Sequence, residues 1–386
     1  MESAAQYCFA SVPRVWTGPG CLGKLGDEVR LLGAARVLVV SDRIIESLGV
    51  VGRVKDMVAG AGASVDTYLD VSGEPSFDQI EQAAGGLTGE YDLIVGVGGG
   101  SSLDTAKGLS LRLKLGGPLT KFAGTEMAPR EGIPLILIPT TSGSGSEVTP
   151  IAIFTDKVNG VKTGVVSRFI RAKTAIIDPE LTIGLPPRVT AHTGVDALTH
   201  AVEAYVSRYS SPTSDVFALE AIRLISTSLR HAVHNGKDIT GRTSMSIASM
   251  YAGWAFANAG VGAVHALAYP LGGRFGIPHG LANALLLVEV CRFNIPACPE
   301  RFAEIGRAMG LDRTGPSVRH AADAAVEAIG CLARDVGIPK GLRDEGVLEE
   351  SIPSMSEEAS KISRLLGNNP RAMSATDIEV VYRRAF

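Results

Sequence analysis

The sequence predicts two domains, an α/β domain built on a parallel sheet over residues 1–185 and an all-helical domain over residues 186–386. Up to about residue 185, short β-branched runs alternate with helical stretches, which is typical of parallel strands joined by covering helices. After the Pro186–Pro187 pair the strand pattern nearly vanishes, and proline is favoured in the first turn of a helix. The 386 residues also exceed the roughly 250–300 at which one hydrophobic core stops growing.

Three strands and two helices are expected in the first domain. The strands are short apolar runs bounded by Gly, Pro or Asp, as expected of a buried parallel sheet. They cover residues 36–40, 93–97 and 135–138. The apolar spacing of a helix covers residues 80–87 and 103–115. The opening segment near residues 9–16 could form an antiparallel hairpin with the chain that follows.

The second domain has helical periodicity throughout. Apolar residues recur there at three- and four-residue spacing, which predicts amphipathic helices. The stretches are residues 191–206, 216–233, 244–267, 282–290, 301–309, 318–336 and 378–385. No flexible linker separates the two domains, and we place their boundary near residue 185.

Composition excludes several classes of protein. The net charge is −3 and no block of Lys and Arg occurs, so nothing favours a nucleic-acid partner. The five cysteines contain no CxxC pair, which predicts reduced thiols and no disulfide framework. The N-terminus lacks the pattern of a signal peptide, and no apolar run reaches the about 18–20 residues of a membrane span. We expect a cytoplasmic protein without a membrane partner.

A glycine-rich turn follows the strand predicted at residues 93–97. Three consecutive glycines at residues 98–100 lack Cβ atoms, so their N–H groups can approach an anion closely. Ser101 or Ser102 could cap the next helix, whose N-terminus favours a pyrophosphate. The segment is not G-x-G-x-x-G, because the sixth position counted from Gly96 is Ser101. Taken alone, it fits a plain tight turn about as well.

A second turn, rich in hydroxyl groups, follows the strand predicted at residues 135–138. The segment PTTSGSGSE places five hydroxyls within seven residues. They belong to Thr140, Thr141, Ser142, Ser144 and Ser146. A surface loop of Ser and Gly is the alternative, but two such turns after two strands of one sheet favour a ligand site. Ligands of open α/β sheets bind beyond the carboxyl ends of the strands.

Asp42 ends the stretch RVLVVSD, which contains the strand predicted at residues 36–40. An acidic residue there can accept hydrogen bonds from an adenosine ribose and repel a 2′-phosphate, which favours NAD over NADP. In the usual Rossmann order such an acid follows the glycines by about 20 residues. Here it precedes them by more than fifty, so we expect a variant Rossmann-like dinucleotide-binding domain. A solvent-exposed Asp at a strand end is the competing interpretation.

Four residues of the second domain have the chemistry of a divalent-metal site. Asp196 and His200 are four residues apart in a strongly helical pattern, so they share one face. His265 and His279 flank a connection rich in Gly and Pro. Three imidazoles and one carboxylate suit Fe²⁺ or Zn²⁺.

The chain holds four further histidines. His192 lies one turn before Asp196, so spacing alone does not exclude it as a ligand. His231, His234 and His320 have polar neighbours, and we predict that they lie on the surface.

Together these segments resemble the iron-containing (group III) alcohol dehydrogenase family over nearly the whole chain. The motifs are GGGSSLDTAKG, PTTSGSGSEVT, DPELTIGLPP, TGVDALTHAVEAYVS, HALAYPLGGRFGIPHGLANALLL and NNPRAMSATDIEVVY. The glycine motif is shared with glycerol-dehydrogenase-like and dehydroquinate-synthase-like relatives, whereas the histidine-bearing motif is highly specific. The resemblance implies an N-terminal dinucleotide domain and a C-terminal metal-binding domain.

The resemblance also implies roles for individual residues. The metal ligands would be Asp196, His200, His265 and His279, in preference to His192. The NAD contacts would be Asp42, Gly98, Gly99, Ser101, Asp104, Thr140, Thr141, Ser144 and Lys162. A substrate pocket is expected at Thr149, Ile151, Ile153 and Phe256. We predict that the catalytic residues are His265, His279, Asp104 and Tyr269.

Two positions depart from the family pattern. Tyr269 stands where some members carry a histidine implicated in proton transfer, and a phenol relays a proton less readily near neutral pH. Val288 and Glu289 replace a Pro-His pair that often follows LLL in the family.

The function predicted from the resemblance is reversible hydride transfer between NAD(H) and a small primary alcohol/aldehyde pair or diol, with Fe²⁺ or Zn²⁺ bound, in a homodimer or larger homo-oligomer. Alternatives are a zinc polyol (glycerol-like) dehydrogenase, a metal-dependent lyase of the dehydroquinate-synthase type, and a catalytically silent sensor. The lyase needs several basic residues for a phosphorylated, carboxylated substrate. Only Arg274 and Arg371 lie near the metal motifs in the sequence, which disfavours it.

Overall fold

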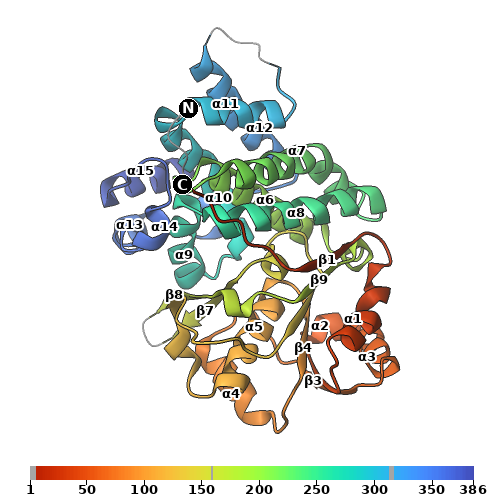
Figure 1. Cartoon of the computed structure of the whole chain (residues 1–386). Helices are drawn as coiled ribbons and strands as arrows, with labels where there is room; N and C mark the ends of the chain where they lie inside the picture. Colours follow the sequence, from red (N-terminus) through yellow and green to blue (C-terminus); the bar gives the residue numbers. More distant parts are fainter. Residues whose placement is uncertain (1–5, 158–159, 313–316) are drawn as a thin grey trace. The chain divides into compact units, whose positions relative to one another are not determined.

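The computed structural model describes residues 6–157, 160–312 and 317–386, which divide into two compact units (Figure 1). One unit is Ser11–Gly184, and the other combines residues 6–10 with Leu185–Phe386. The first contains a parallel sheet with helices, and the second is helical, so the predicted fold class is confirmed.

The main sheet of the α/β unit has six strands in the order β1-β9-β6-β4-β2-β3, and every neighbouring pair is parallel. The strands are β1 (Arg14–Thr17), β2 (Arg36–Val40), β3 (Ser64–Tyr68), β4 (Leu93–Gly98), β6 (Leu135–Pro139) and β9 (Thr174–Ile177). The central strands β4 and β6 are buried along their whole length. This explains why their sequences are continuous apolar runs without alternation.

Helices cover the sheet. They are α1 (Leu25–Leu31), α2 (Arg43–Ser47), α3 (Val50–Gly60), α4 (Phe77–Gly86) and α5 (Gly100–Leu115). One core cluster joins α1 and α3 to one side of β2, β4 and β6. Helix α5 contacts β4 and β6 closely, because a Cβ added at Gly96 of β4 would meet Ala106 and Leu137 at 2.8 Å. The helices predicted at residues 80–87 and 103–115 lie within α4 and α5, except that α4 ends one residue earlier, at Gly86.

The hairpin expected near residues 9–16 is wrong. Strand β1 pairs in parallel with β9, and Arg14 lies opposite Thr174. In the described part of this unit, two strands that do pair antiparallel are β7 (Ile151–Asp156) and β8 (Val161–Val166), in a small sheet that also holds β5 (Gly124–Thr125). A single short strand shows its β propensity but not its partner, because pairing across the sheet is a long-range property.

The helical unit follows the predicted periodicity closely. Its helices are α6 (Pro187–Val206), α7 (Pro212–His234), α8 (Ile239–Ala259), α9 (Ala263–Phe275), α10 (His279–Asn294), α11 (Pro299–Ala308), α12 (Val318–Asp335), α13 (Ile352–Ser360), α14 (Ser363–Leu366) and α15 (Ala375–Ala385). Proline occupies the first turn of α6, as expected. The single helix predicted at residues 244–267 is wrong, because α8 ends before Gly260, which has a φ of 78°.

Helix α6 is the centre of this unit. All residues from Gly194 to Val206 are buried, and α6 contacts α7, α8 and α10. Among the described residues, one stretch, His279–Ala297, is long and apolar enough to cross a membrane by composition. Most of it is buried inside the protein, and α10 packs against α6 and α9. It is therefore a core helix.

Candidate metal centre and phosphate-binding turns

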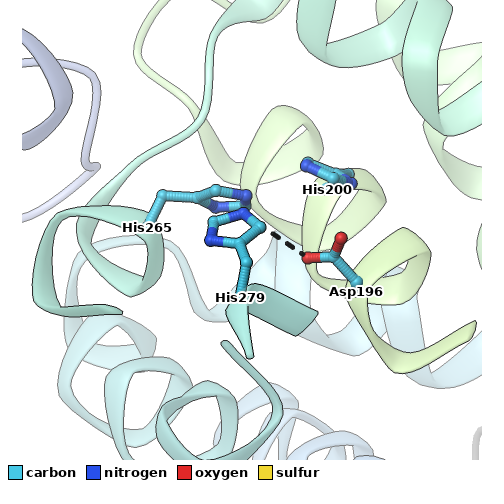
Figure 2. Close-up of side chains that lie close together, drawn as sticks. All are labelled: Asp196, His200, His265 and His279. Carbon is cyan, nitrogen blue, oxygen red and sulfur yellow. Dashed lines mark ion pairs between the residues drawn. The ribbon is translucent and has the colours of Figure 1, made fainter. Parts of the chain in front are cut away.

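Four side chains from three helices converge in the helical unit (Figure 2). Asp196 and His200 lie one turn apart on α6, His265 lies in the first turn of α9, and His279 begins α10. Each offers one donor atom, and these four atoms all lie within 4.8 Å of one another. The structure thus brings together the four residues that the sequence singled out.

Close contact between α10 and α6 makes this convergence possible. A Cβ added at Gly280 would lie 2.7 Å from the backbone oxygen of His192 and 3.3 Å from Cβ of Asp196. Glycine at this position therefore lets the first turn of α10 approach α6. His192 itself is not one of the four clustered residues. The remaining histidines, His231, His234 and His320, are exposed, as predicted.

The charge distribution favours an ionised carboxylate at the centre of the cluster. Burial alone would raise the pKa of Asp196, but His200, His279, His265 and the Asn283 amide together lower it. Asp196 is buried. The side chain of His279 is 33% exposed, against 7% for the side chain of Asp196 and 5% for that of His265, so solvent reaches the cluster beside His279.

Asn283, which the sequence analysis missed, lies against three of the four residues. Its Nδ2 donates to Asp196 Oδ1 at 2.7 Å and lies 3.2 Å from Nε2 of both His265 and His279. Its Oδ1 is buried without a hydrogen-bond partner in the described parts of the chain. Asn283 follows His279 by one turn of α10, and this spacing is the only signal that could have indicated it.

Glu203, also missed, lies on the opposite side of His265. Its Oε2 is 2.5 Å from His265 Nδ1, and its Oε1 accepts a hydrogen bond from the backbone N–H of Val264 at 2.6 Å. Glu203 follows Asp196 by seven residues along α6. The helical spacing placed it on the same face, but a carboxylate on a buried face has many possible partners.

An aromatic ring covers His200. Phe256 of α8 stacks on the imidazole with ring centroids 4.3 Å apart and an interplanar angle of 18°. Phe256 is itself buried. Tyr269, the other predicted aromatic participant, lies one turn after His265 on α9 and is partly exposed.

The donor set fits a divalent transition-metal ion. Bonds from such ions to His nitrogen and carboxylate oxygen are about 2.0–2.2 Å long, so two donors in a tetrahedral site are about 3.4 Å apart. The four donor atoms, all within 4.8 Å of one another, would move inward to bind one ion. Three imidazoles and a carboxylate suit Fe²⁺ and Zn²⁺ alike.

In the α/β unit, Asp42 lies beside the glycine turn although it is far from it in sequence. Strand β2 is the neighbour of β4, so the carboxyl ends of both strands lie on the same edge of the sheet. Asp42 Oδ1 accepts hydrogen bonds from the N–H groups of Ile44 and Ile45 at 2.9 and 3.0 Å, capping α2. Its Oδ2 accepts one from Ser102 Oγ at 3.3 Å.

The glycine turn is built from positions that exclude side chains. Gly98 has a φ of 145°, and a Cβ there would lie 2.5 Å from Ser102 Oγ. The expected serine cap of the following helix is wrong. The N-cap of α5 is Gly99, no side chain caps the helix, and Ser102 Oγ donates to Asp42 instead. Backbone N–H groups at this helix start can therefore face an anion.

The hydroxyl-rich turn lies directly against the glycine turn. The N–H of Thr140 donates to the backbone oxygen of Gly98 at 2.9 Å. A Cβ added at Gly100 would lie 3.1 Å from Cβ of Ser144, and one added at Gly99 would lie 3.7 Å from Cγ2 of Thr141. The two turns predicted separately therefore form one polar surface at the carboxyl ends of β4 and β6.

Asp104 and the buried Lys107, both on α5, form hydrogen bonds to the hydroxyl-rich turn and to β7. Both carboxylate oxygens of Asp104 are occupied, by Ser146 Oγ at 2.6 Å and by the N–H of Ile153 at 2.9 Å. Lys107 Nζ donates to the backbone oxygens of Ser146 and Ile151 at 2.6 and 2.7 Å. Burial lowers the pKa of Lys107 to about 8. Lys107 is not recognisable from the sequence, because a lysine in a polar helical motif is usually exposed.

The other residues predicted in this unit are a cofactor contact and three substrate-pocket residues. Lys162 Nζ lies 2.7 Å from Glu74 Oε1, and its side chain is 8% exposed. Ile151 and Ile153 occupy alternate positions of β7 and are partly exposed, whereas Thr149 is buried.

Two sequence models of one protein family divide the chain between them. The model described as iron-containing alcohol dehydrogenase matches residues 13–179. The model described as Fe-containing alcohol dehydrogenase family, C-terminal, matches residues 190–386. The chain belongs to the iron-containing alcohol dehydrogenase family. It is thus an oxidoreductase of the NAD- and metal-dependent alcohol dehydrogenase type. The resemblance predicted from the sequence is confirmed.

Individual members of this family resemble the chain along its whole length. It is 44% identical to long-chain-alcohol dehydrogenase 1 of Geobacillus thermodenitrificans, across 100% of this chain and 97% of that protein. A crystal structure of 1,3-propanediol oxidoreductase has a TM-score of 0.96 and 39% identity, covering 99% of this chain and 100% of that one. Sulfoacetaldehyde reductase from Bifidobacterium kashiwanohense, solved in complex with NAD⁺, has a TM-score of 0.89 and 29% identity over 99% of both chains.

Proposed function

We propose that this protein catalyses reversible hydride transfer between NAD(H) and a small primary alcohol/aldehyde pair or diol. In the oxidative direction, the alcohol carbon gives a hydride to NAD⁺ and the hydroxyl group loses a proton, so the products are aldehyde, NADH and H⁺. The observation that carries the proposal is the cluster of Asp196, His200, His265 and His279 in a chain of this family.

We assign the chemistry to two domains, residues 1–185 for NAD and residues 186–386 for the metal ion and catalysis. The boundary is supported by the division of the chain between Gly184 and Leu185, and each group of residues lies within one compact unit, although residues 6–10 belong to the helical unit. The phosphate-binding turns lie wholly in the α/β unit, and the four metal-binding side chains lie wholly in the helical unit.

Fe²⁺ is the proposed ion, because the family is described as iron-containing, and Zn²⁺ is the alternative that the same donors suit. An ion held by these residues supplies Lewis acidity, which lowers the pKa of an alcohol or polarises a carbonyl group. We propose that His265 and His279 would take part in catalysis as well as in holding the ion. The pairing of Asp196 with Asn283 keeps the carboxylate in one orientation.

For NAD, the helix start at Gly98, Gly99 and Ser101 provides N–H groups for the pyrophosphate. The hydroxyls of Thr140, Thr141 and Ser144 and the ammonium group of Lys162 complete the proposed contacts. Asp42 provides a carboxylate that accepts hydrogen bonds from ribose hydroxyls and repels a 2′-phosphate. Because both oxygens of Asp104 hold the hydroxyl-rich turn, we propose that Asp104 supports the cofactor site through that turn and takes no part in proton transfer.

For the substrate, we propose Phe256, which stacks on His200, and the residues Thr149, Ile151 and Ile153 of the α/β unit as contact residues. These side chains are mostly apolar, which favours a short, weakly polar molecule. Tyr269, one turn from His265, is the proposed proton relay. A phenolic hydroxyl can both donate and accept a hydrogen bond, so we propose that this relay acts through hydrogen bonds.

Anaerobic purification followed by metal analysis and an alcohol/aldehyde panel with NAD(H) and NADP(H) tests this function. The expected result is bound divalent ion and aldehyde-dependent oxidation of NADH. Protein that carries its ion but turns over no member of the panel would contradict the proposal.

The lyase alternative has little support. Arg274 pairs with Glu358, and Arg371 lies over the ring of Phe293 and donates to its backbone oxygen. Both basic residues are therefore engaged with other groups. The zinc polyol dehydrogenase alternative differs only in ion and substrate, so the same panel, with glycerol included, separates it.

We also propose a cytoplasmic location, which the five free thiols support. Assembly into a homodimer or larger homo-oligomer remains a prediction from the family resemblance.

A further inference from the structure

Glu203 is a buried carboxylate on the metal-binding face of α6. It follows Asp196 by seven residues and His200 by three, so all three side chains leave the same side of the helix. Glu203 is 4% exposed. Among the described residues, its hydrogen-bond partners are the ring of His265 and the N–H of Val264, and neither is an arginine or lysine side chain.

The contact with His265 determines which ring nitrogen carries the proton. A neutral imidazole has one N–H donor and one lone-pair acceptor. With Glu203 Oε2 2.5 Å from Nδ1, the proton belongs on Nδ1, because a carboxylate only accepts. The lone pair is then on Nε2, the atom that faces Asn283 at 3.2 Å within the cluster.

The contact with Val264 anchors the backbone that carries His265. Val264 is the second residue of α9, and the first N–H groups of a helix have no acceptor within the helix. Glu203 Oε1 accepts this N–H at 2.6 Å, and a negative charge is favoured at a helix N-terminus. A Cβ added at Gly262 would lie only 3.3 Å from the same oxygen. Glu203 therefore fixes both the ring and the helix start next to it.

We propose that Glu203 is a positioning residue that holds His265 in the tautomer and orientation required to bind the divalent ion. One helix thus supplies two ligands, Asp196 and His200, and the support for a third. The inference rests on the proposed function, since it requires that the four-residue cluster binds an ion. Groups that support metal-bound histidines in this way typically change ion affinity by 10–100-fold when removed.

Glu203→Gln is the informative variant, because glutamine has the same shape but only one acceptor oxygen. If that oxygen accepts the hydrogen bond from the Val264 N–H, the amide N–H₂ group faces His265 Nδ1. The ring must then move its proton to Nε2 or rotate, and either change removes the lone pair from the cluster. If the oxygen instead accepts the hydrogen bond from His265 Nδ1, the Val264 N–H at the start of α9 loses its acceptor.

The measurements are made on protein stripped of metal and titrated with Co²⁺ in competition with a chelator. We expect Glu203→Gln to weaken Co²⁺ binding by about 10–100-fold and to alter the visible absorption of the bound Co²⁺. Binding of NADH, followed by fluorescence, is expected to stay within about twofold of wild type. Glu203→Asp, which keeps the charge on a shorter side chain, is expected to give a smaller loss and serves if the glutamine variant does not fold.

Glu289→Gln is the matched control. Glu289 is a mostly buried carboxylate of α10 that lies ten residues after His279 and pairs with Arg292. This variant is expected to bind Co²⁺ as the wild type does. Wild-type Co²⁺ affinity and spectrum in a folded Glu203 variant would overturn the positioning role, even if its melting temperature falls. Failure of the wild-type protein to bind Co²⁺ would instead overturn the metal site itself, and the positioning role with it.

Discussion

The two candidate sites of this protein differ in the kinds of chemical group that form them. The metal centre consists of side chains that converge from α6, α9 and α10. The phosphate-binding turns consist of backbone groups and short hydroxyl side chains at the ends of β4 and β6. The metal centre requires particular side chains, whereas the phosphate-binding turns also require glycines, which have no Cβ atom.

This difference predicts which substitutions each site tolerates. Removing one imidazole from the cluster deletes an ion ligand that no neighbour replaces. Adding one methyl group at Gly98 introduces a Cβ at 2.5 Å from Ser102 Oγ and an unfavourable φ of 145°. Truncation should therefore damage the metal centre, and enlargement should damage the turns.

The largest expected effect is that of His265→Ala. Loss of this ligand removes Lewis-acid stabilisation worth several kcal/mol, so kcat is expected to fall by about 1,000-fold or more. Bound metal should fall with it, whereas NADH affinity should stay within about twofold, because the cofactor contacts lie in the α/β unit. Metal analysis and NADH fluorescence titration measure both. Loss of NADH binding with the metal retained would contradict the assignment of ion binding and cofactor binding to separate sites.

Gly98→Ala should have the reverse profile. Forcing a side chain into this conformation costs on the order of 1–3 kcal/mol, so the NADH dissociation constant is expected to rise about tenfold while metal content is unchanged. Gly52→Ala is the matched control, because Gly52 lies in α3 and a Cβ there meets nothing within 4 Å. Equal effects of the two variants would show that the turn has no special requirement for glycine.

Asn283→Ala should weaken ion binding more moderately, by about tenfold. The variant removes the donor 2.7 Å from Asp196 Oδ1 but leaves all four ligands in place. Chelator competition measures the effect, and Asn235→Ala, an exposed asparagine after α7, provides the control. An unchanged dissociation constant would mean that Asp196 is held by its ligation alone.

The smallest expected effect concerns cofactor choice. Asp42→Asn keeps an oxygen able to cap α2 but removes the charge, so the ratio of kcat/KM for NADP relative to NAD should rise by up to about tenfold. Asp42→Gly should raise it similarly but also lose the cap, at a cost of a few tenths of a kcal/mol to stability. A ratio unchanged in both variants would remove Asp42 from the ribose site.

Sequence reasoning succeeded where the signal is local. The helical repeat placed Asp196 and His200 on one face, and the apolar runs marked β2, β4 and β6. It failed for the helix predicted at residues 244–267, which breaks at Gly260. A Cβ at Gly260 would meet Asn368 at 2.4 Å, and a constraint imposed by a residue about a hundred positions away leaves no periodic trace.

The partners within each site were also beyond local signals. Glu203 and Asn283 show the right helical spacing, but so do many residues that only fill a core. Lys107 looks like a surface lysine until its acceptors, Ser146 and Ile151, are known.

The amino-acid sequence by itself determined the two-part architecture, the family, and the four residues with the chemistry to bind a metal ion, because periodicity and residue type are properties of short segments. Only the tertiary structure decided that Asp42 lies beside the glycine turn, that Glu203 contacts His265, and that β1 pairs with β9. These contacts depend on which strands and helices become neighbours, and that is set by the packing of the whole core.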